Sequence, residues 1–178
     1  MPELARAPAY SEEVVAGHRF YAVQSGIAAI ELPVPDSFSP LSEQEFVVAS
    51  LLSIGKTLNQ IRGSTAVELS RGEAVQIEES AQAKLGVKTP SALVHQLIGR
   101  GILPIVVNKD WDLIRGLPAS DRYALRSYAQ GVPVERIADT LGMTVPKFIK
   151  YEPVLLRKVG ARKRPQAVRY SHELGIID

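Results

Sequence analysis

Basic side chains gather in the segment MTVPKFIKYEPVLLRKVGARKRPQAVRY, residues 143–170, where Glu152 is the one acidic residue. Lys147 and Lys150 are three residues apart, so on a helix they lie on the same face. A lysine can donate to guanine acceptors, a threonine methyl can pack on thymine, and a tyrosine can reach a phosphate. Cations further along could lie against flanking phosphates. The candidate DNA-contacting residues are therefore Thr144, Lys147, Lys150, Tyr151, Arg157, Lys158, Arg162, Lys163 and Arg164.

Charge is distributed unevenly along the chain, whose formal net charge is +2. Residues 1–40 contain two arginines and five acidic residues, and residues 41–103 contain six basic and six acidic residues. Residues 104–178 contain thirteen basic and eight acidic residues. An excess of positive charge confined to the last third of the chain indicates a polyanionic partner.

The basic segment has two other interpretations. A solvated basic surface is the plainest alternative, since most runs of charge have no other role. A membrane surface is disfavoured, because the apolar stripe of the segment is needed for the core and no Trp or Phe faces outward with the lysines. No apolar run approaches the roughly 18 residues that span a bilayer.

Residue sets typical of enzymes are missing. The chain has no cysteine, and His18, His95 and His172 lie far apart without ligand spacing. The stretch 53–58 lacks the first glycine of a phosphate-binding loop. We therefore expect no catalytic activity, no cofactor and no metal site. The N-terminus lacks the layout of a signal peptide, which favours a cytoplasmic protein.

From Leu41 onward the sequence repeats itself with a period of about 75 residues. LSEQEFVVASLLSIG (41–55) aligns with LPASDRYALRSYAQG (117–131). KLGVKTPSALVHQLIGRGIL (84–103) aligns with KVGARKRPQAVRYSHELGII (158–177) without a gap. This similarity indicates a duplicated unit.

Each copy is predicted to form four helices. In the second copy Val134, Ile137, Ala138 and Leu141 have the spacing of one apolar helix face, and Gly142 ends that helix. Thr144 is the predicted N-cap of the next helix, whose stripe is Phe148, Leu155 and Val159. Two helices joined by a short turn form a helix-turn-helix, although a plain bundle of packed helices would have the same periodicity.

Residues 1–40 are predicted to form one helix, capped by Ser11 and running through SEEVVAGHRFYAVQSG, followed by the Pro-rich linker ELPVPDSFSP. Residues 104–116 are a connector between the copies, and Trp111 is expected to anchor it by packing.

Each copy resembles the C-terminal DNA-binding domain of LuxR-type (NarL/FixJ-type) bacterial regulators. The resemblance rests on an opening Leu followed by an acidic residue and a closing Gly, namely Leu41, Glu45 and Gly55, and Leu117, Asp121 and Gly131. It also rests on VERIADTLGMT (134–144), on the turns AKLGV and RKVGA, and on KRPQAVRYSHELGII. The second copy is the closer match. The resemblance implies an all-α chain with two tandem four-helix modules, at 41–103 and 117–178, preceded by the short N-terminal helix.

Several residues depart from the pattern of that family. Arg62 and Gly63 interrupt the scaffold helix of the first copy. Glu78 and Glu152 stand at stripe positions that are usually apolar, so each must reach solvent or a cation, and Arg62 is a candidate partner of Glu78. Pro153 lies inside the second recognition helix, where we expect a kink or an early end.

The first copy is predicted to be mainly structural, or to contact a protein. Its segment RGEAVQIEESAQAKLGVK balances basic against acidic residues, which leaves Arg71 and Gln76 as candidate secondary DNA contacts. In the LuxR-type family the fourth helix is the usual dimer contact. The resemblance therefore implies that helix 90–101 packs on helix 165–175 in an intramolecular pseudo-dimer, or that either helix forms a homodimer.

Two functions remain open from the sequence. The first is a bacterial or phage-type DNA-binding transcription regulator, a repressor or accessory factor, which inserts the recognition helix of the second module into the major groove. The second is a protein–protein adaptor that uses the same fold to bind RNA polymerase, a sigma factor or another regulator.

Overall fold

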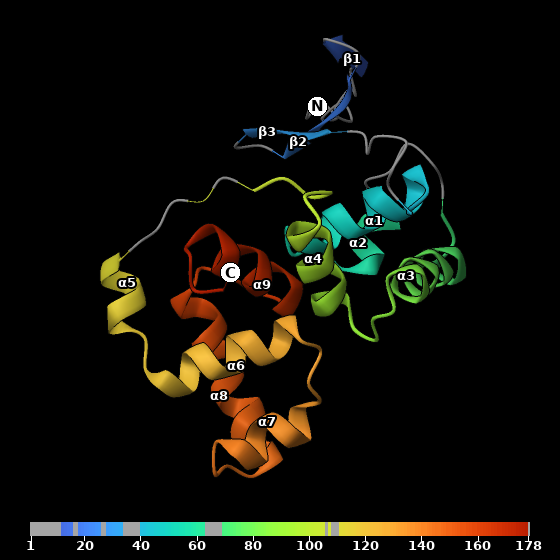
Figure 1. Cartoon of the computed structure of the whole chain (residues 1–178). Helices are drawn as coiled ribbons and strands as arrows, with labels where there is room; N and C mark the ends of the chain where they lie inside the picture. The colour runs from blue at the N-terminus through green and yellow to red at the C-terminus, as the bar shows by residue number, and fades with distance from the viewer. Residues whose placement is uncertain are drawn as a thin grey trace, which may run out of the picture. The chain divides into compact units, whose positions relative to one another are not determined.

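The structure is a computed structural model that describes residues 12–15, 18–25, 28–33, 40–62, 69–105, 107 and 111–177 (Figure 1). For the strands it describes the backbone, and the side chains of Arg62 and Arg71 lie outside the described part. The chain divides after Phe38 into two compact units, residues 1–38 and residues 39–178.

The N-terminal unit contains a three-stranded antiparallel sheet in the order β1-β2-β3, formed by β1 (Glu12–Val15), β2 (His18–Ser25) and β3 (Ala28–Pro33). The predicted helix over this segment is therefore wrong, and its predicted cap Ser11 lies outside the described residues. The segment is rich in Val, Phe and Tyr, which favour strands, and a glycine stands between neighbouring strands in the sequence. The apolar spacing that suggested a helix is equally compatible with paired strands.

The second unit is helical throughout its described residues, in agreement with the predicted all-α class. Its first repeat forms α1 (Glu43–Ser53), α2 (Leu58–Arg62), α3 (Arg71–Leu85) and α4 (Pro90–Gly99). The connector contains α5 (Trp111–Gly116). The second repeat forms α6 (Ala119–Ala129), α7 (Val134–Thr140), α8 (Val145–Lys158) and α9 (Arg164–Glu173).

The two repeats begin their third helices in the same way. The hydroxyl of Ser70 accepts a hydrogen bond from the backbone of Glu73, and that of Thr144 accepts one from Lys147, so both caps serve the third residue of the helix. The predicted cap at Thr144 is confirmed. Ser70 belongs to a full capping box, in which the Glu73 carboxylate accepts from the Ser70 N–H at 2.7 Å.

The repeats pack on each other through their fourth helices. Helix α4 lies against α9, and each fourth helix also contacts the first helix of the other repeat: α4 contacts α6, and α9 contacts α1 (Figure 1). This exchange of equivalent contacts is what a two-fold relation between the repeats would produce. The predicted packing of the fourth helices within one chain is confirmed.

Two glycines show the same exchange at closer range. A Cβ added to Gly55 would lie 2.6 Å from Oε1 of Gln166 in α9, and one added to Gly131 would lie 3.3 Å from Cβ of Ala92 in α4. Both glycines follow a first helix and have positive φ, at 85° and 69°. The turn after the first helix of each repeat therefore lies close to the first turn of the fourth helix of the other repeat. A side chain in place of either glycine would contact that helix.

His95 of α4 and His172 of α9 meet at the junction of the repeats. Nδ1 of His95 lies 2.8 Å from Nε2 of His172, and the rings stack with centroids 5.0 Å apart. His172 is 4% exposed. A hydrogen bond between two imidazoles requires that one nitrogen carry a proton and the other accept, so the contact is made by neutral rings or by one protonated ring.

Apolar side chains fill the second repeat as the periodicity predicts. Phe148, Leu155 and Val159 of α8 are buried, and Ile137 of α7 is fully buried. Val134 and Leu141 are partly buried against the same core. The predicted core faces of α7 and α8 are therefore confirmed.

Two predicted details differ from the structure. Helix α8 continues through Pro153 to Lys158, so of the kink or early end expected at this proline, the early end is wrong. Trp111 is 58% exposed and does not anchor the connector by burial. The connector meets the core instead through Leu113 and Ile114, which are partly buried against it.

Replacing Phe148 with alanine should lower the free energy of unfolding by about 3–5 kcal/mol, because it removes a fully buried ring from the core. The neighbouring Ile149 is 55% exposed, so Ile149→Ala should change stability by no more than about 0.5 kcal/mol. Urea unfolding followed by circular dichroism measures both. Equal midpoints for the two variants would show that the core face of α8 is assigned wrongly.

The stability of the protein should fall at acid pH because His95 is buried at the contact between α4 and α9. Burial lowers the pKa of His95 below its ordinary value of 6.5. The unfolded chain then binds the proton more readily, so the contribution of His95 is complete above about pH 6.5 and is lost as the pH falls toward the folded pKa. Melting temperatures of the wild type between pH 8 and pH 5 should fall more steeply than those of His95→Gln. Parallel curves would contradict this expectation.

Candidate nucleic-acid interface

Helices α7 and α8 and the turn of residues 141–144 form the helix-turn-helix of the second repeat. Ile137 and Ala138 bury one face of α7, and the backbone N–H of Met143 donates to the carbonyl of Ala138 at 2.8 Å. Thr144 then caps α8 and fixes where it begins. The buried face of α8 is thereby docked on the repeat, and its opposite face is left to solvent.

The outward face of α8 carries free cations. Lys147, Lys150 and Arg157 are exposed, and none of them forms an ion pair or side-chain hydrogen bond with the described residues. Ile149 and Val154 are also exposed on this helix, at 55% and 47%. No exposed apolar residues were predicted for α8. They could have been predicted, because Ile149 and Val154 do not have the spacing of the buried stripe formed by Phe148, Leu155 and Val159.

Two candidate contact residues, Tyr151 and Lys158, are held by a carboxylate of the same repeat. Asp121 of α6 is 1% exposed, and it accepts from the hydroxyl of Tyr151 and, at 2.6 Å, from Nζ of Lys158. Burial and the hydrogen bond to Asp121 raise the pKa of Tyr151 to about 12. Both side chains therefore help to hold α8 on α6, and their polar groups are already engaged by Asp121.

The first repeat contains the counterpart of this ion pair. Glu45 of α1 is 4% exposed and lies 2.7 Å from Nζ of Lys84 near the end of α3. Burial acts to raise the pKa of Glu45, but hydrogen bonds from Lys84, Ser80 and the Ser42 N–H outweigh it and lower the pKa to about 2. An acid on the first helix and a lysine on the third are therefore a structural feature of both repeats.

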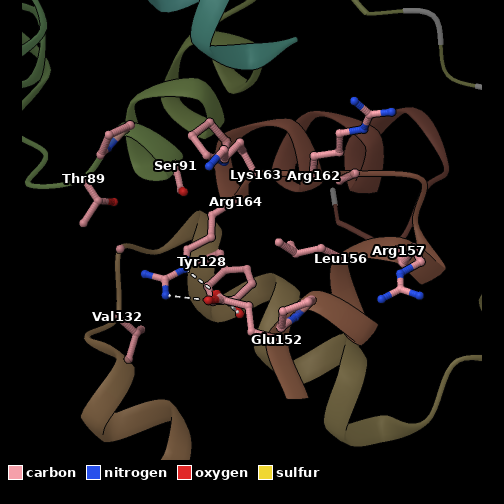
Figure 2. Close-up of a pocket in the computed structure, with 15 residues that line it drawn as sticks. Thr89, Ser91, Tyr128, Val132, Glu152, Leu156, Arg157, Arg162, Lys163 and Arg164 are labelled. Carbon is pink, nitrogen blue, oxygen red and sulfur yellow. Dashed lines mark hydrogen bonds and ion pairs between the residues drawn. The ribbon is translucent and has the colours of Figure 1, made fainter. Parts of the chain in front are cut away.

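Arg164 is also engaged within the chain. It forms a bidentate pair with Glu152, with Nη2 2.9 Å from Oε2, and it lies over the ring of Tyr128 at 5.3 Å (Figure 2). The Tyr128 hydroxyl donates to Glu152 at 2.7 Å. Burial acts to raise the pKa of Glu152, but these hydrogen bonds outweigh it and lower it. The expectation that Glu152 requires a cation is confirmed, and Arg164 supplies it.

The carboxylate of Glu78 accepts a hydrogen bond from a neutral side chain, unlike that of Glu152, which is paired with an arginine. Nε2 of Gln82 donates to its carboxylate at 2.7 Å, and burial raises the pKa of Glu78. The side chain of its proposed partner Arg62 lies outside the described residues.

Five of the predicted cations keep an unpaired and exposed head group among the described residues. They are Lys147, Lys150, Arg157, Arg162 and Lys163. Thr144 is exposed beside them, with its hydroxyl used as the cap of α8. Tyr151, Lys158 and Arg164, the other members of the predicted set, are engaged by carboxylates of the same chain.

The equivalent surface of the first repeat is acidic. Glu73 takes in α3 the place that Lys147 takes in α8, because each is the residue whose N–H is capped. Gln76, which corresponds to Lys150, is exposed, and so is Glu79. The side chain of Arg71 is outside the described residues. The exposed residues near the starts of α3 and α8 thus carry different charges.

Comparison of the chain with protein families, with characterised proteins and with solved structures finds no match. Among the described residues, no helix is both long enough and apolar enough to cross a bilayer. Nor do His, Asp and Glu side chains gather there in threes as metal ligands would.

Lys158 and Lys150 should respond differently to truncation. Lys158→Ala leaves the buried carboxylate of Asp121 without its cation, so the free energy of unfolding should fall by roughly 1–2 kcal/mol. The loss should be near the low end for a hydrogen bond between charged groups, because Lys158 is partly exposed to solvent. Lys150→Ala removes no contact and should stay within about 0.5 kcal/mol of the wild type. Thermal unfolding of both variants at pH 7 tests this. Identical melting temperatures would mean that the pair with Asp121 does not hold α8.

Proposed function

We propose that the protein binds double-stranded DNA and acts as a transcription regulator, either a repressor or an accessory factor, with α8 in the major groove. The observation that carries the proposal is the outward direction of Lys147 and Lys150, which have no carboxylate partner among the described residues. They stand in the first turns of the second helix of a helix-turn-helix, where base edges are contacted in that motif.

The surroundings of these lysines support a groove-bound helix. The major groove is about 12 Å wide and accepts one α-helix, provided that the helix is backed by its own domain. Phe148 and Leu155 provide that backing. Arg157, Arg162 and Lys163 are placed after the lysines in the chain and would contact flanking phosphates, which fix orientation without reading sequence.

Only one repeat is suited to this contact. Glu73 and Glu79 would bring negative charge against phosphates if α3 entered a groove. The protein would therefore use one α8 per chain, although its repeats are related as the halves of a dimer. The target would then be a single half-site of one module, without the inverted symmetry of a two-fold regulator.

A protein–protein adaptor is the second candidate. Exposed Ile149 and Val154 favour it, because an exposed apolar side chain on a helix can anchor in the groove of a partner protein. The same residues could instead contact thymine methyl groups, so they do not decide between the two functions.

Fluorescence anisotropy with a random duplex at two salt concentrations tests DNA binding. The wild type should bind at low salt and weaken steeply as salt rises, because counterions are released from the phosphates. Lys147→Ala/Lys150→Ala should weaken binding and flatten the salt slope by about two units, close to one per lost phosphate or base contact.

The matched control removes two basic residues from the first repeat, Arg71→Ala/Lys88→Ala. It has the same change of net charge and should alter affinity far less. Equal losses in the two double variants would mean that the repeats have been assigned the wrong roles. A wild-type protein that fails to bind near micromolar at low salt would reject DNA binding and favour the adaptor.

A further inference from the structure

A pocket of about 890 Å³ lies where the two repeats meet (Figure 2). One wall is the first turn of α4, residues 89–91, and the other walls come from the second repeat. These are the end of α6 with its turn, the second half of α8, and the loop that leads into α9. Thus neither repeat forms the pocket alone.

The lining of this pocket is strongly basic. Four cations line it, namely Arg157, Arg162, Lys163 and Arg164, and Glu152 is its one acidic residue. Glu152 is already neutralised by Arg164 and by the hydroxyl of Tyr128. The other three cations have no carboxylate partner among the described residues, so the pocket has an excess of positive charge that nothing in those residues balances.

Ser91 is a polar group left without a partner in this pocket. It is 5% exposed and lines the pocket, yet its hydroxyl has no hydrogen-bond partner among the described residues. Figure 2 shows Ser91 and Lys163 at neighbouring helix starts, above Tyr128 and Glu152, with the hydroxyl of Ser91 directed into the pocket. The hydroxyl is reached from the pocket and is used by no other group among the described residues, so an oxygen atom of a ligand could accept its hydrogen bond.

Helices α4 and α9, of ten residues each, both begin at this pocket. The first turns of α4 and α9 both line the pocket, so the positive ends of their dipoles lie beside it, although Pro90 and Pro165 supply no N–H to a ligand. At α4 the hydroxyl of Thr89 caps the N–H of Ala92. At α9 the N-cap is Lys163, which forms no side-chain capping bond, so this helix start lacks the oxygen acceptor that usually occupies it.

We infer that this pocket binds a phosphate group, held by the side chains of Ser91 and Lys163 and by the start of α9. A phosphate supplies oxygen acceptors for the hydroxyl, the ammonium and the helix N-terminus together, and its charge matches the lining. Arg157 and Arg162 also line the pocket, but their guanidinium groups point away from Ser91 and Lys163, so they would attract an anion only over a longer distance (Figure 2). Val132, Pro153 and Leu156 form an apolar wall beside the site, so the group carrying the phosphate can be partly apolar.

The phosphate site stands independently of DNA binding, because it rests on Ser91 and the two helix starts and not on Lys147 or Lys150. Its occupant could be a small phosphorylated molecule or the backbone of a bound duplex. Either would bridge the repeats, since Ser91 belongs to the first and Lys163 to the second.

Titration with pyrophosphate at constant ionic strength tests the site on the full chain, by calorimetry and by the melting temperature. We expect saturable binding and a rise in melting temperature. Ser91→Ala and Lys163→Gln should each weaken binding about tenfold, the loss expected for one hydrogen bond to a charged group. Lys147→Gln has the same change of charge as Lys163→Gln but lies outside the pocket, so it should bind pyrophosphate like the wild type.

Absence of saturable binding would overturn the inference, and so would undiminished binding by both Ser91→Ala and Lys163→Gln. A weakening by Lys147→Gln equal to that by Lys163→Gln would also overturn it, because general charge would then account for the effect.

Adding a random duplex distinguishes the source of the phosphate. If the DNA backbone occupies the pocket, pyrophosphate and duplex compete, and Lys163→Gln weakens both. If a small molecule is the natural occupant, pyrophosphate and duplex bind together. Both results support a phosphate site. Loss of DNA binding in Lys147→Ala/Lys150→Ala with pyrophosphate binding intact would separate this site from the proposed function.

Discussion

In each repeat a buried carboxylate on the first helix binds a lysine near the end of the third helix: Glu45 lies 2.7 Å from Lys84, and Asp121 lies 2.6 Å from Lys158. A carboxylate withdrawn from water is unfavourable unless a cation and hydrogen bonds meet it, so the third helix is stable only in orientations that bring the lysine to the acid. The pair contributes orientation more than stability, because an apolar pair of the same volume could stabilise the helix contact equally well. Once the orientation is set, the face of α8 opposite Phe148 is turned to solvent.

The same ion pairs decide which basic residues remain free for a partner. In the second repeat Lys158 and Arg164 are used by Asp121 and Glu152, while Lys147 and Lys150 are not used. In the first repeat the residue that corresponds to Lys147 is Glu73, whose carboxylate completes the capping box of α3. The side chain at this position therefore caps the helix in the first repeat, whereas in the second repeat the side chain of Lys147 is exposed and forms no such contact. The difference lies in single side chains at matching positions of two helices that begin with the same kind of cap.

Features that depend on neighbouring residues could be predicted from the sequence, and features that depend on distant residues could not. The cap at Thr144 and the buried face of Phe148, Leu155 and Val159 follow from spacing within one helix. The N-terminal sheet was missed because pairing between strands has no local signature when Val, Phe and Tyr also fit a helical spacing. Exposure of Trp111 could not be read from residue type, and the capture of Lys158 by Asp121 joins residues 37 apart in the chain. The pocket was missed for the same reason, since Ser91 and Lys163 belong to different repeats.

The junction between the repeats connects the elements that form the two candidate sites. Helices α4 and α9 form its centre, and the pair His95–His172 lies between them. The first turns of the same two helices line the pocket, and residues of α8 line another wall of it. A ligand in the pocket would therefore be held by both repeats, and by linkage it would stabilise the arrangement of α8 relative to the first repeat. Protonation of His95 acts against that arrangement, because burial disfavours the charged form of its ring at the contact between α4 and α9.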